Sequence, residues 1–294
     1  MASTQDDGCY KTLAILASIA TIIGVIISCI ALIPAFGQWL PVRSPFPVGT
    51  STPAITAILT PTVRQMISTA RIVPGAQVAA FPQDKWVIAV GNRILVIADD
   101  GNVFAHDFAD NWVSAAYPIS GARVAPLPQD KWVLEMGDRI LVVNTIGDVW
   151  AQNVNGNTVS EAYQLPGAFV GAQPQDKRVF ILGNKILVVT QDGTLWAHTV
   201  TSDQVSMGSP LTGSKIALAD QDKWVIGMGN RILVIKISGE IWAYDVIDSV
   251  VSAPYRLNGP PVGSQPSDKR VLVIGNKIAV IAQDGTVWVH DVMP

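Results

Sequence analysis

The dipeptide Asp-Lys occurs at positions 84, 130, 176, 222 and 268, so that each copy lies 46 residues after the one before it. A repeat of this length is typical of propellers and solenoids, whose units bury their apolar faces only against neighbouring units. The chain beyond the first repeat is therefore expected to consist of copies of one supersecondary unit.

Each repeat contains two tight turns between apolar runs. The first turn is Gly-Asn or Gly-Asp in all five copies, beginning at Gly91, Gly137, Gly183, Gly229 and Gly275. The second retains a glycine, at Gly101, Gly147, Gly193, Gly239 and Gly285. Two-residue turns of this composition join antiparallel strands, since glycine tolerates positive φ. A fourth apolar run, such as that from Val159, makes each repeat a four-stranded meander, which is one propeller blade.

The two ends of the repeat region complement each other. The fifth repeat stops at Pro294 without its fourth strand, whereas Ser68–Val73 aligns with the fourth-strand segment that begins at Ser114, again 46 residues later. An N-terminal strand that completes the last blade hides two sheet edges. We predict an all-β fold over residues 65–294: a five-bladed β-propeller of four-stranded antiparallel blades, closed by an N-terminal strand.

The late part of the repeats carries Asp-Gly-X-(Leu/Val)-Trp, as in Asp192-Gly193-Thr194-Leu195-Trp196. With the closed five-blade plan, this motif resembles the tachylectin-2 class of five-bladed lectin propellers and, more loosely, quinone-type propeller repeats. The resemblance implies a lectin-like propeller over residues 65–294. No sugar-binding motif of that class matches named positions here, so no binding residue is carried over.

The N-terminal part has a different composition. Thr12–Ile33 contains no charged residue and as a helix spans about 33 Å, enough for one membrane crossing. We expect a short tail (residues 1–11), a single transmembrane α-helix (residues 12–33) and a Pro/Ser/Thr-rich stalk (residues 34–64). Signal-anchor logic places the N-terminus in the cytoplasm and the propeller outside it, in the periplasm or at the cell surface.

Two other fates of this segment remain open. The first is cleavage as a secretory signal, which its hydrophobicity resembles, although no good cleavage site follows it. The second is a lipoprotein signal, because Ile26-Ile27-Ser28-Cys29 resembles a bacterial lipobox, in which Cys29 is lipidated after cleavage. In an uncleaved helix, small residues fall on one face and either pack against another helix or reflect ordinary membrane-helix composition; they are Ala17, Ala20, Gly24, Ser28 and Ala31.

Composition excludes several functions. A net charge of −3 and a pI near 5.5 provide no basic surface for nucleic acid. The only cysteines, Cys9 and Cys29, precede the repeats, so no disulfide is expected there. His106, His198 and His290 share one repeat position without metal-ligand spacing, and we expect no metal or cofactor.

The acidic residues show no acid-base pair, because Glu135, Glu161 and Glu240 are the only glutamates and none recurs in other repeats. A catalytic site needs an asymmetric set of groups, whereas nearly every polar position here is repeated. We therefore expect no enzyme. A channel-mouth hydrolase or oxidoreductase is a remote alternative that requires unrepeated polar residues to converge at one rim.

The strongest binding candidate is the residue triplet at the start of each first strand, which in a propeller lies nearest the central channel. Five copies form a ring at one mouth: Asp84, Lys85, Trp86, Asp130, Lys131, Trp132, Asp176, Lys177, Arg178, Asp222, Lys223, Trp224, Asp268, Lys269 and Arg270. The ring either holds acidic or sugar groups or merely fixes the loops between blades.

The sequence thus favours a membrane-anchored, non-enzymatic propeller that serves as a scaffold or an accessory subunit of a membrane complex. Its expected partners are the bilayer, other membrane proteins and further copies of itself through the helix. The alternative is a cell-surface lectin with one shallow glycan site per blade. The aromatic residue on each third strand, such as Trp150 or Trp242, is expected to pack between blades, and stacking on a ligand is its alternative role.

Overall fold

The computed structural model describes residues 66–109, 111–217 and 219–293, and within them the chain is all-β with no helix. The all-β prediction is confirmed. None of the described residues forms a helix with the length and hydrophobicity to cross a bilayer. The predicted tail, membrane helix, stalk, lipobox at Cys29 and small-residue helix face all lie outside the described residues.

Each repeat contributes three consecutive antiparallel strands, which we call units 1 to 5 in chain order. The first strands are β3 (Asp84–Val90), β8 (Asp130–Met136), β13 (Asp176–Leu182), β18 (Asp222–Met228) and β23 (Asp268–Ile274). The second strands are β4 (Arg93–Ala98), β9 (Arg139–Asn144), β14 (Lys185–Thr190), β19 (Arg231–Lys236) and β24 (Lys277–Ala282). The third strands are β5 (Val103–Ala109), β10 (Val149–Asn155), β15 (Leu195–Thr199), β20 (Ile241–Ile247) and β25 (Val287–Met293).

A shorter fourth strand pairs antiparallel with each third strand. These strands are β7 (Tyr117–Gly121), β12 (Tyr163–Leu165), β16 (Ser209–Pro210), β22 (Tyr255–Arg256) and β2 (Arg71–Val73). The sequence did not predict a second set of two-residue strands at the rim, which comprises β1 (Met66–Ile67), β6 (Trp112–Val113), β11 (Thr158–Val159), β17 (Thr212–Gly213) and β21 (Val250–Val251). Parallel pairs β7–β11 and β17–β21 join neighbouring units there.

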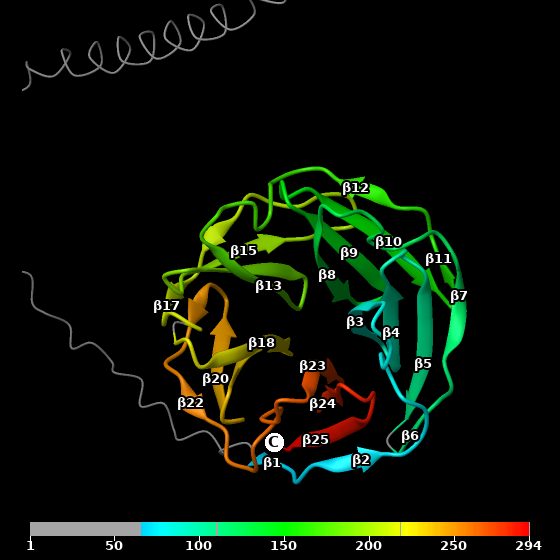
Figure 1. Cartoon of the computed structure of the whole chain (residues 1–294). Coiled ribbons are helices and arrows are strands. Elements are labelled where there is room, and N and C mark those ends of the chain that lie inside the picture. The colour runs from blue at the N-terminus through cyan, green and yellow to red at the C-terminus, as the bar shows by residue number, and fades with distance from the viewer. Residues whose placement is uncertain (1–65, 110, 218, 294) are drawn as a thin grey trace, which may run out of the picture. The chain divides into compact units, whose positions relative to one another are not determined.

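The five first strands contact one another in a closed cycle: β3 with β8, β8 with β13, β13 with β18, β18 with β23 and β23 with β3. Figure 1 shows them facing the centre of a ring, with the fourth strands at its periphery. Antiparallel meanders arranged radially around an axis define a β-propeller.

Five hydrophobic clusters hold the described residues together, one between each pair of neighbouring units. Leu95 of unit 1 and Ile140 of unit 2 belong to one of them, and both are fully buried. Ile281 of unit 5 and Ile94 of unit 1 belong to the cluster that joins the last unit to the first. Both faces of a unit are therefore core, which explains why strands such as β4 are continuously apolar after their first residue, here from Ile94 to Ala98, instead of alternating.

The ring closes with the segment that the repeat alignment indicated. β2 pairs with β25 in the register Ile72 with Trp288, and β1 pairs with the end of β25 in the register Ile67 with Val292. The prediction that an N-terminal strand completes the last sheet is confirmed. Ile67 is 3% exposed and packs in the cluster between units 4 and 5.

The first turn of each unit has positive φ at glycine only, for example +58° at Gly91, while the following Asn92 does not. Glycine at the first central position is typical of a type II′ hairpin, whose twist suits the flanking strands. We call this end of the units the hairpin end. The opposite end, where the first strands begin, is the Asp-Lys end.

Candidate functional site

The five aspartates of the Asp-Lys pairs fix the loops that lead into the first strands. In each unit Oδ2 accepts a hydrogen bond from the backbone N–H three residues earlier, at 2.7–3.0 Å. The donors are Phe81, Leu127, Gln173, Ala219 and Gln265. A carboxylate that accepts a backbone N–H stabilises the turn it closes.

The lysine after each aspartate sits at a β-bulge, because the strand register shifts between the aspartate and the residue after the lysine in all five units. A bulge re-aims the side chain of the extra residue. In three units Nζ donates to a backbone carbonyl of the next unit: Lys131 to Gly171 at 3.2 Å, Lys223 to Gly263 at 3.1 Å and Lys269 to Ala79 at 2.8 Å. These lysines link neighbouring units.

The residue after the lysine wedges between units. Trp132 lies so close to Gly171 that a Cβ there would come within 2.6 Å of the indole ring. Lys131 Nζ covers the same ring, 3.9 Å from its centroid. Trp224 repeats the arrangement with Gly263 and with Lys223 at 4.0 Å. Both tryptophans are thus half-buried in a junction.

In units 3 and 5 arginine replaces this tryptophan. Arg178 Nη2 donates to the carbonyl of Asp222 at 2.7 Å, and Arg270 Nη2 donates to the carbonyl of Lys85 at 3.1 Å, so each also reaches the next unit. Burial lowers the pKa of both guanidinium groups.

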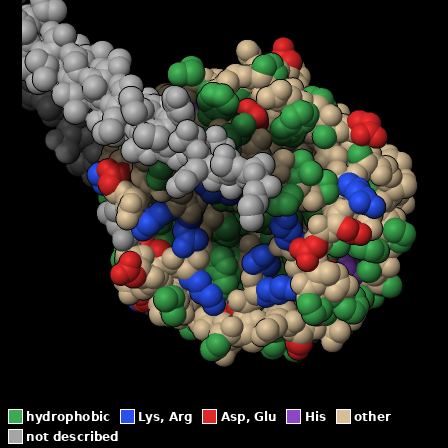
Figure 2. All heavy atoms as spheres, turned by 45° about the horizontal axis from the view of Figure 1, so that its top comes forward, with side chains coloured by type: hydrophobic (Ala, Val, Ile, Leu, Met, Phe, Trp, Pro, Cys, Tyr) green, Lys and Arg blue, Asp and Glu red, His purple; other side chains and the backbone are tan. Residues whose placement is uncertain are grey.

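A central cavity of about 430 Å³ lies between the five first strands. The residue that follows the lysine of each Asp-Lys pair lines the cavity in all five units; these residues are Trp86, Trp132, Arg178, Trp224 and Arg270. Of the five lysines themselves, only Lys177 lines it. On the face seen in Figure 2, Lys and Arg side chains surround the central hollow and hydrophobic side chains lie within it. The cavity brings part of the predicted ring together, whereas the five aspartates close loops and Lys131, Lys223 and Lys269 bridge units.

Glu135 is the carboxylate of the cavity wall among the described residues. The residues at its repeat position in the other units are Ala89, Ile181, Gly227 and Val273, which are all apolar. Burial raises the pKa of Glu135 to about 7, partly offset by a hydrogen bond from the backbone of Gly137. The sequence identified this glutamate as unrepeated but gave no sign that it faces the cavity.

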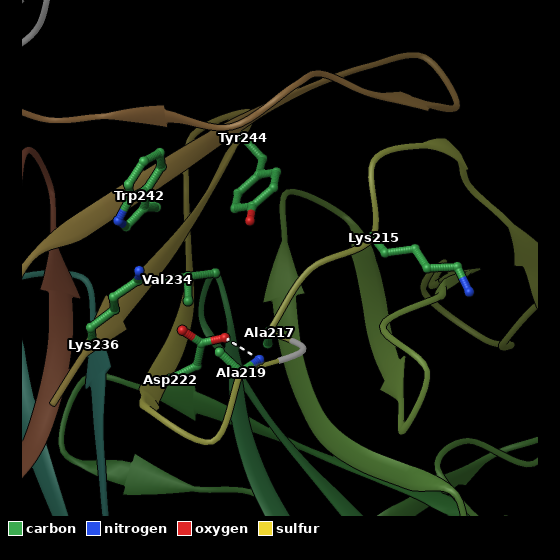
Figure 3. A pocket seen from close by; sticks show the side chains of 8 residues that line it. All are labelled: Lys215, Ala217, Ala219, Asp222, Val234, Lys236, Trp242 and Tyr244. Carbon is green, nitrogen blue, oxygen red and sulfur yellow. Dashed lines mark hydrogen bonds between the residues drawn. The ribbon is translucent and has the colours of Figure 1, made fainter.

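Shallow clefts recur at the periphery near the Asp-Lys end. Figure 3 shows the one in unit 4, of about 240 Å³, where Trp242, Tyr244, Lys236 and Asp222 surround the opening and Lys215 points away from it. Asp222 is held there by its hydrogen bond from Ala219.

The equivalent cleft in unit 3 is larger, about 500 Å³. Trp196, His198 and the exposed Phe169 and Met207 line it. Among the third-strand aromatics, Trp242 and Trp288 pack against the clusters between units, as predicted. Phe104, Trp150 and Trp196 are 36–38% exposed and therefore less enclosed than interblade packing predicts.

The three histidines are buried between third and fourth strands. Nδ1 of His106, His198 and His290 lies 2.9–3.2 Å from the carbonyl oxygen of Ser114, Ser206 and Ser68, respectively. Burial lowers the pKa of His198 and His290. In the described part of the chain no group of His, Cys, Asp and Glu side chains is arranged to hold a metal ion.

The class that this fold and these sites define is an all-β propeller with a central cavity. No protein-family model matches the chain. No curated protein matches it either.

Solved structures with a similar path of the chain include glutaminyl cyclase from Myxococcus xanthus, with 8% identity and a TM-score of 0.43 over 79% of this chain and 100% of that one. Prp20p from Saccharomyces cerevisiae shows 13% identity and a TM-score of 0.36 over 71% and 60% of the two chains. BamB from Moraxella catarrhalis shows 13% identity and a TM-score of 0.31 over 70% and 71%. Likenesses this distant support no transfer of activity or partner.

Proposed function

We propose that this chain is a membrane-anchored, non-enzymatic propeller that binds other proteins as a scaffold or as an accessory subunit of a membrane complex. In this proposal the five units are five blades, residues 12–33 span the bilayer and the propeller lies on the extracytoplasmic side. The uncharged N-terminal run and the 46-residue period motivate these assignments.

The observation that carries the binding role is a set of exposed apolar side chains on loops at the Asp-Lys end. They are between 49% and 65% exposed and comprise Phe81, Leu127, Ile146, Phe169 and Ile237. Backbone hydrogen bonds tie the loops together: Thr145 N–H donates to Gln129, Ile237 N–H to Gln221 and Val170 N–H to Gly147. Neighbouring exposed apolar side chains mark a protein-interaction surface. A second exposed apolar set, which includes Ile247 and Val250, lies at the hairpin end, so the test below compares the two ends.

The non-enzymatic assignment is supported by how the repeated polar groups are used. Each aspartate of the Asp-Lys pairs closes a loop, and three of the lysines bridge units. Among the described residues the cavity wall offers Glu135 without a paired acid or base. General acid-base chemistry needs two such groups within reach of one substrate.

The test compares full-length proteins extracted from native membranes in mild detergent. The wild type is expected to copurify with a stoichiometric partner or with further copies of itself, and Ile146→Glu combined with Phe169→Glu is expected to lose that partner. The matched control is Ile247→Glu, because Ile247 is 64% exposed but lies at the hairpin end. A wild-type protein that is a clean monomer contradicts the proposal, as does equal loss in both variants.

A second candidate is a lectin, which the recurring peripheral clefts favour. Each combines a partly exposed aromatic ring with hydrogen-bonding groups, as Trp196, Thr190 and Asp176 do in unit 3. Sugars bind by stacking on such rings.

A glycan array probed with full-length protein tests the lectin directly. Trp196→Ala is expected to weaken any glycan signal, while Trp112→Ala, which removes an exposed indole outside the clefts described above, is expected to leave it unchanged. A silent array with the wild type removes the lectin candidate without bearing on protein binding.

A further inference from the structure

The wall of the central cavity carries an uneven charge. At the position after the lysine, units 1, 2 and 4 place neutral tryptophans, whereas units 3 and 5 place Arg178 and Arg270. Since β13 and β23 both contact β18, the two arginines come from the strands on either side of the one that carries Trp224. Two half-buried guanidinium groups therefore flank one indole at a single level of the cavity.

Neither guanidinium is paired with a carboxylate among the described residues. Arg178 donates to the backbone carbonyl of Asp222, and Arg270 donates to those of Lys85 and Lys269. Asp222 exerts a favourable Coulomb effect on Arg178, but burial is the only cause that shifts the pKa of Arg270. A guanidinium has five N–H donors, so both groups retain donors beyond these bonds.

Lys177 adds a third positive charge. It is exposed, whereas the other four lysines of the Asp-Lys pairs are only partly exposed. Lys131, Lys223 and Lys269 donate to carbonyls of the next unit, and Lys177 makes no such bond in the part of the chain that the structure describes. Its unit has no tryptophan ring for the side chain to cover, because Arg178 occupies that place.

Glu135 does not neutralise these charges. It lies three residues further along its strand than Trp132, about 10 Å in an extended chain. Burial and the Gly137 backbone account for its pKa, and no basic side chain is among the causes. Among the described residues, the cavity therefore has a cationic Asp-Lys end and a single deeper carboxyl group.

We propose that the Asp-Lys end of the central cavity is a binding site for a small oxyanion ligand, a di- or tricarboxylate or a phosphate, held by Arg178, Arg270 and Lys177. Guanidinium groups bind carboxylates and phosphates with paired hydrogen bonds, and partial burial strengthens the attraction. A cavity of about 430 Å³ accommodates a ligand of this size. The site is independent of the apolar loops that carry the proposed scaffold role.

Isothermal titration of full-length protein in neutral detergent tests the site, with citrate and pyrophosphate as separate probes and sodium chloride adjusted to constant ionic strength. Saturable binding of one or both is expected at about 10 mM or below, and the stronger probe distinguishes a carboxylate site from a phosphate site. The double variant Arg178→Gln and Arg270→Gln is expected to weaken binding by about tenfold or more, and Lys177→Gln by a few-fold.

Two controls keep the result interpretable. Arg256→Gln removes a surface cation that pairs with Glu240 outside the cavity and is expected to leave the affinity unchanged. Arg178→Trp combined with Ala217→Gly installs the pair that Trp132 forms with Gly171 and Trp224 with Gly263, so it keeps the packing of those junctions while removing the charge. The proposal is overturned if neither probe binds, or if binding survives in both the glutamine pair and a folded Arg178→Trp, Ala217→Gly protein.

Discussion

Nδ1 of His290 lies 3.0 Å from the carbonyl oxygen of Ser68, although 222 residues separate the two in the chain. Next to this contact the backbone N–H of Asp291 donates to Ser68 Oγ at 2.7 Å. His106 and Ser114 make the same pair of contacts eight residues apart within unit 1, where Asp107 N–H donates to Ser114 Oγ. The N-terminal segment therefore reproduces, across the closure of the ring, a contact that is local elsewhere.

The closing segment is expected to contribute to global stability. Ile67→Ala removes a side chain that is 3% exposed and packs between units 4 and 5, so the free energy of unfolding should fall by about 2 to 5 kcal/mol. Met66→Ala is the control, because Met66 is 52% exposed and should change stability by about 0.5 kcal/mol or less. Urea unfolding of the full-length protein, followed by tryptophan fluorescence, measures both. If Ile67→Ala is as stable as Met66→Ala, burial of Ile67 in the closing segment does not contribute to the free energy of unfolding.

Gly171 is expected to be required by Trp132. Ala79, Ala125 and Ala217 occupy the equivalent position with similar positive φ, so the backbone alone does not demand glycine there. Ala125 accompanies Trp86, but that ring lies differently, with Lys85 Nζ 5.9 Å from its centroid against 3.9 Å at Trp132, so the prediction concerns the ring position of Trp132. A Cβ at Gly171 would lie 2.6 Å from the Trp132 ring, and Gly171→Ala should therefore destabilise the protein by about 1 to 3 kcal/mol.

A second substitution identifies the cause of that loss. Adding Trp132→Arg to Gly171→Ala recreates the combination of Arg178 with Ala217 and should recover part of the lost stability. The comparison uses urea midpoints of the two variants and of the wild type. If the double variant is no more stable than Gly171→Ala, the indole is not the source of the strain.

The arrangement of the strands was predictable because it depends on local signals that repeat. Gly91 and its four equivalents specify the same turn, and Ser68 aligns with Ser114 at the same offset that separates the repeats. The short strands at the rim, such as β6 and β11, were not predictable. They are two residues long and fold back onto the end of their own third strand, and β11 also pairs with β7 of the preceding unit, which no local pattern records.

The candidate site was only partly predictable for the same reason. Sequence repetition marked the Asp-Lys pairs but did not separate binding from loop closure, because both roles recur in every unit. Only three-dimensional contacts show that Asp130 accepts a hydrogen bond from the Leu127 N–H and that Lys131 donates to the Gly171 carbonyl, whereas Lys177 lines the cavity. The β-bulge at the lysine has no signature in the apolar pattern that follows it.

The aspartates of the Asp-Lys pairs are expected to act locally. Asp130→Ala removes the acceptor for the Leu127 N–H and should cost about 1 kcal/mol, while Asp130→Asn keeps an oxygen acceptor and should cost less. Hydrogen exchange at the Leu127 amide should accelerate in the alanine variant. Asp138→Ala, on an exposed hairpin turn, is the control. Unchanged protection of Leu127 in Asp130→Ala would show that the carboxylate does not hold the loop.

Glu135 is expected to make stability depend on pH between about 4.5 and 7. Its pKa is raised from 4.5 to about 7 by burial, so in this window the unfolded chain releases the proton before the folded protein does. The stability that the protonated Glu135 carboxyl group contributes is fully present below pH 4.5. It falls as the pH rises through the window and is lost above pH 7.

Glu135→Gln lacks the ionisable group and should show none of this decline. Its free energy of unfolding relative to the wild type should rise from its value near pH 4 to a plateau above pH 7, by on the order of 1 to 3 kcal/mol given the remaining solvent exposure. Urea unfolding at closely spaced pH values measures the difference, and Glu161→Gln, an exposed glutamate outside the cavity, should instead track the wild type. If the difference in free energy of unfolding between Glu135→Gln and the wild type stays constant across the whole range, this carboxyl group is solvated like a surface glutamate. Only a buried acid destabilises the folded protein when it ionises.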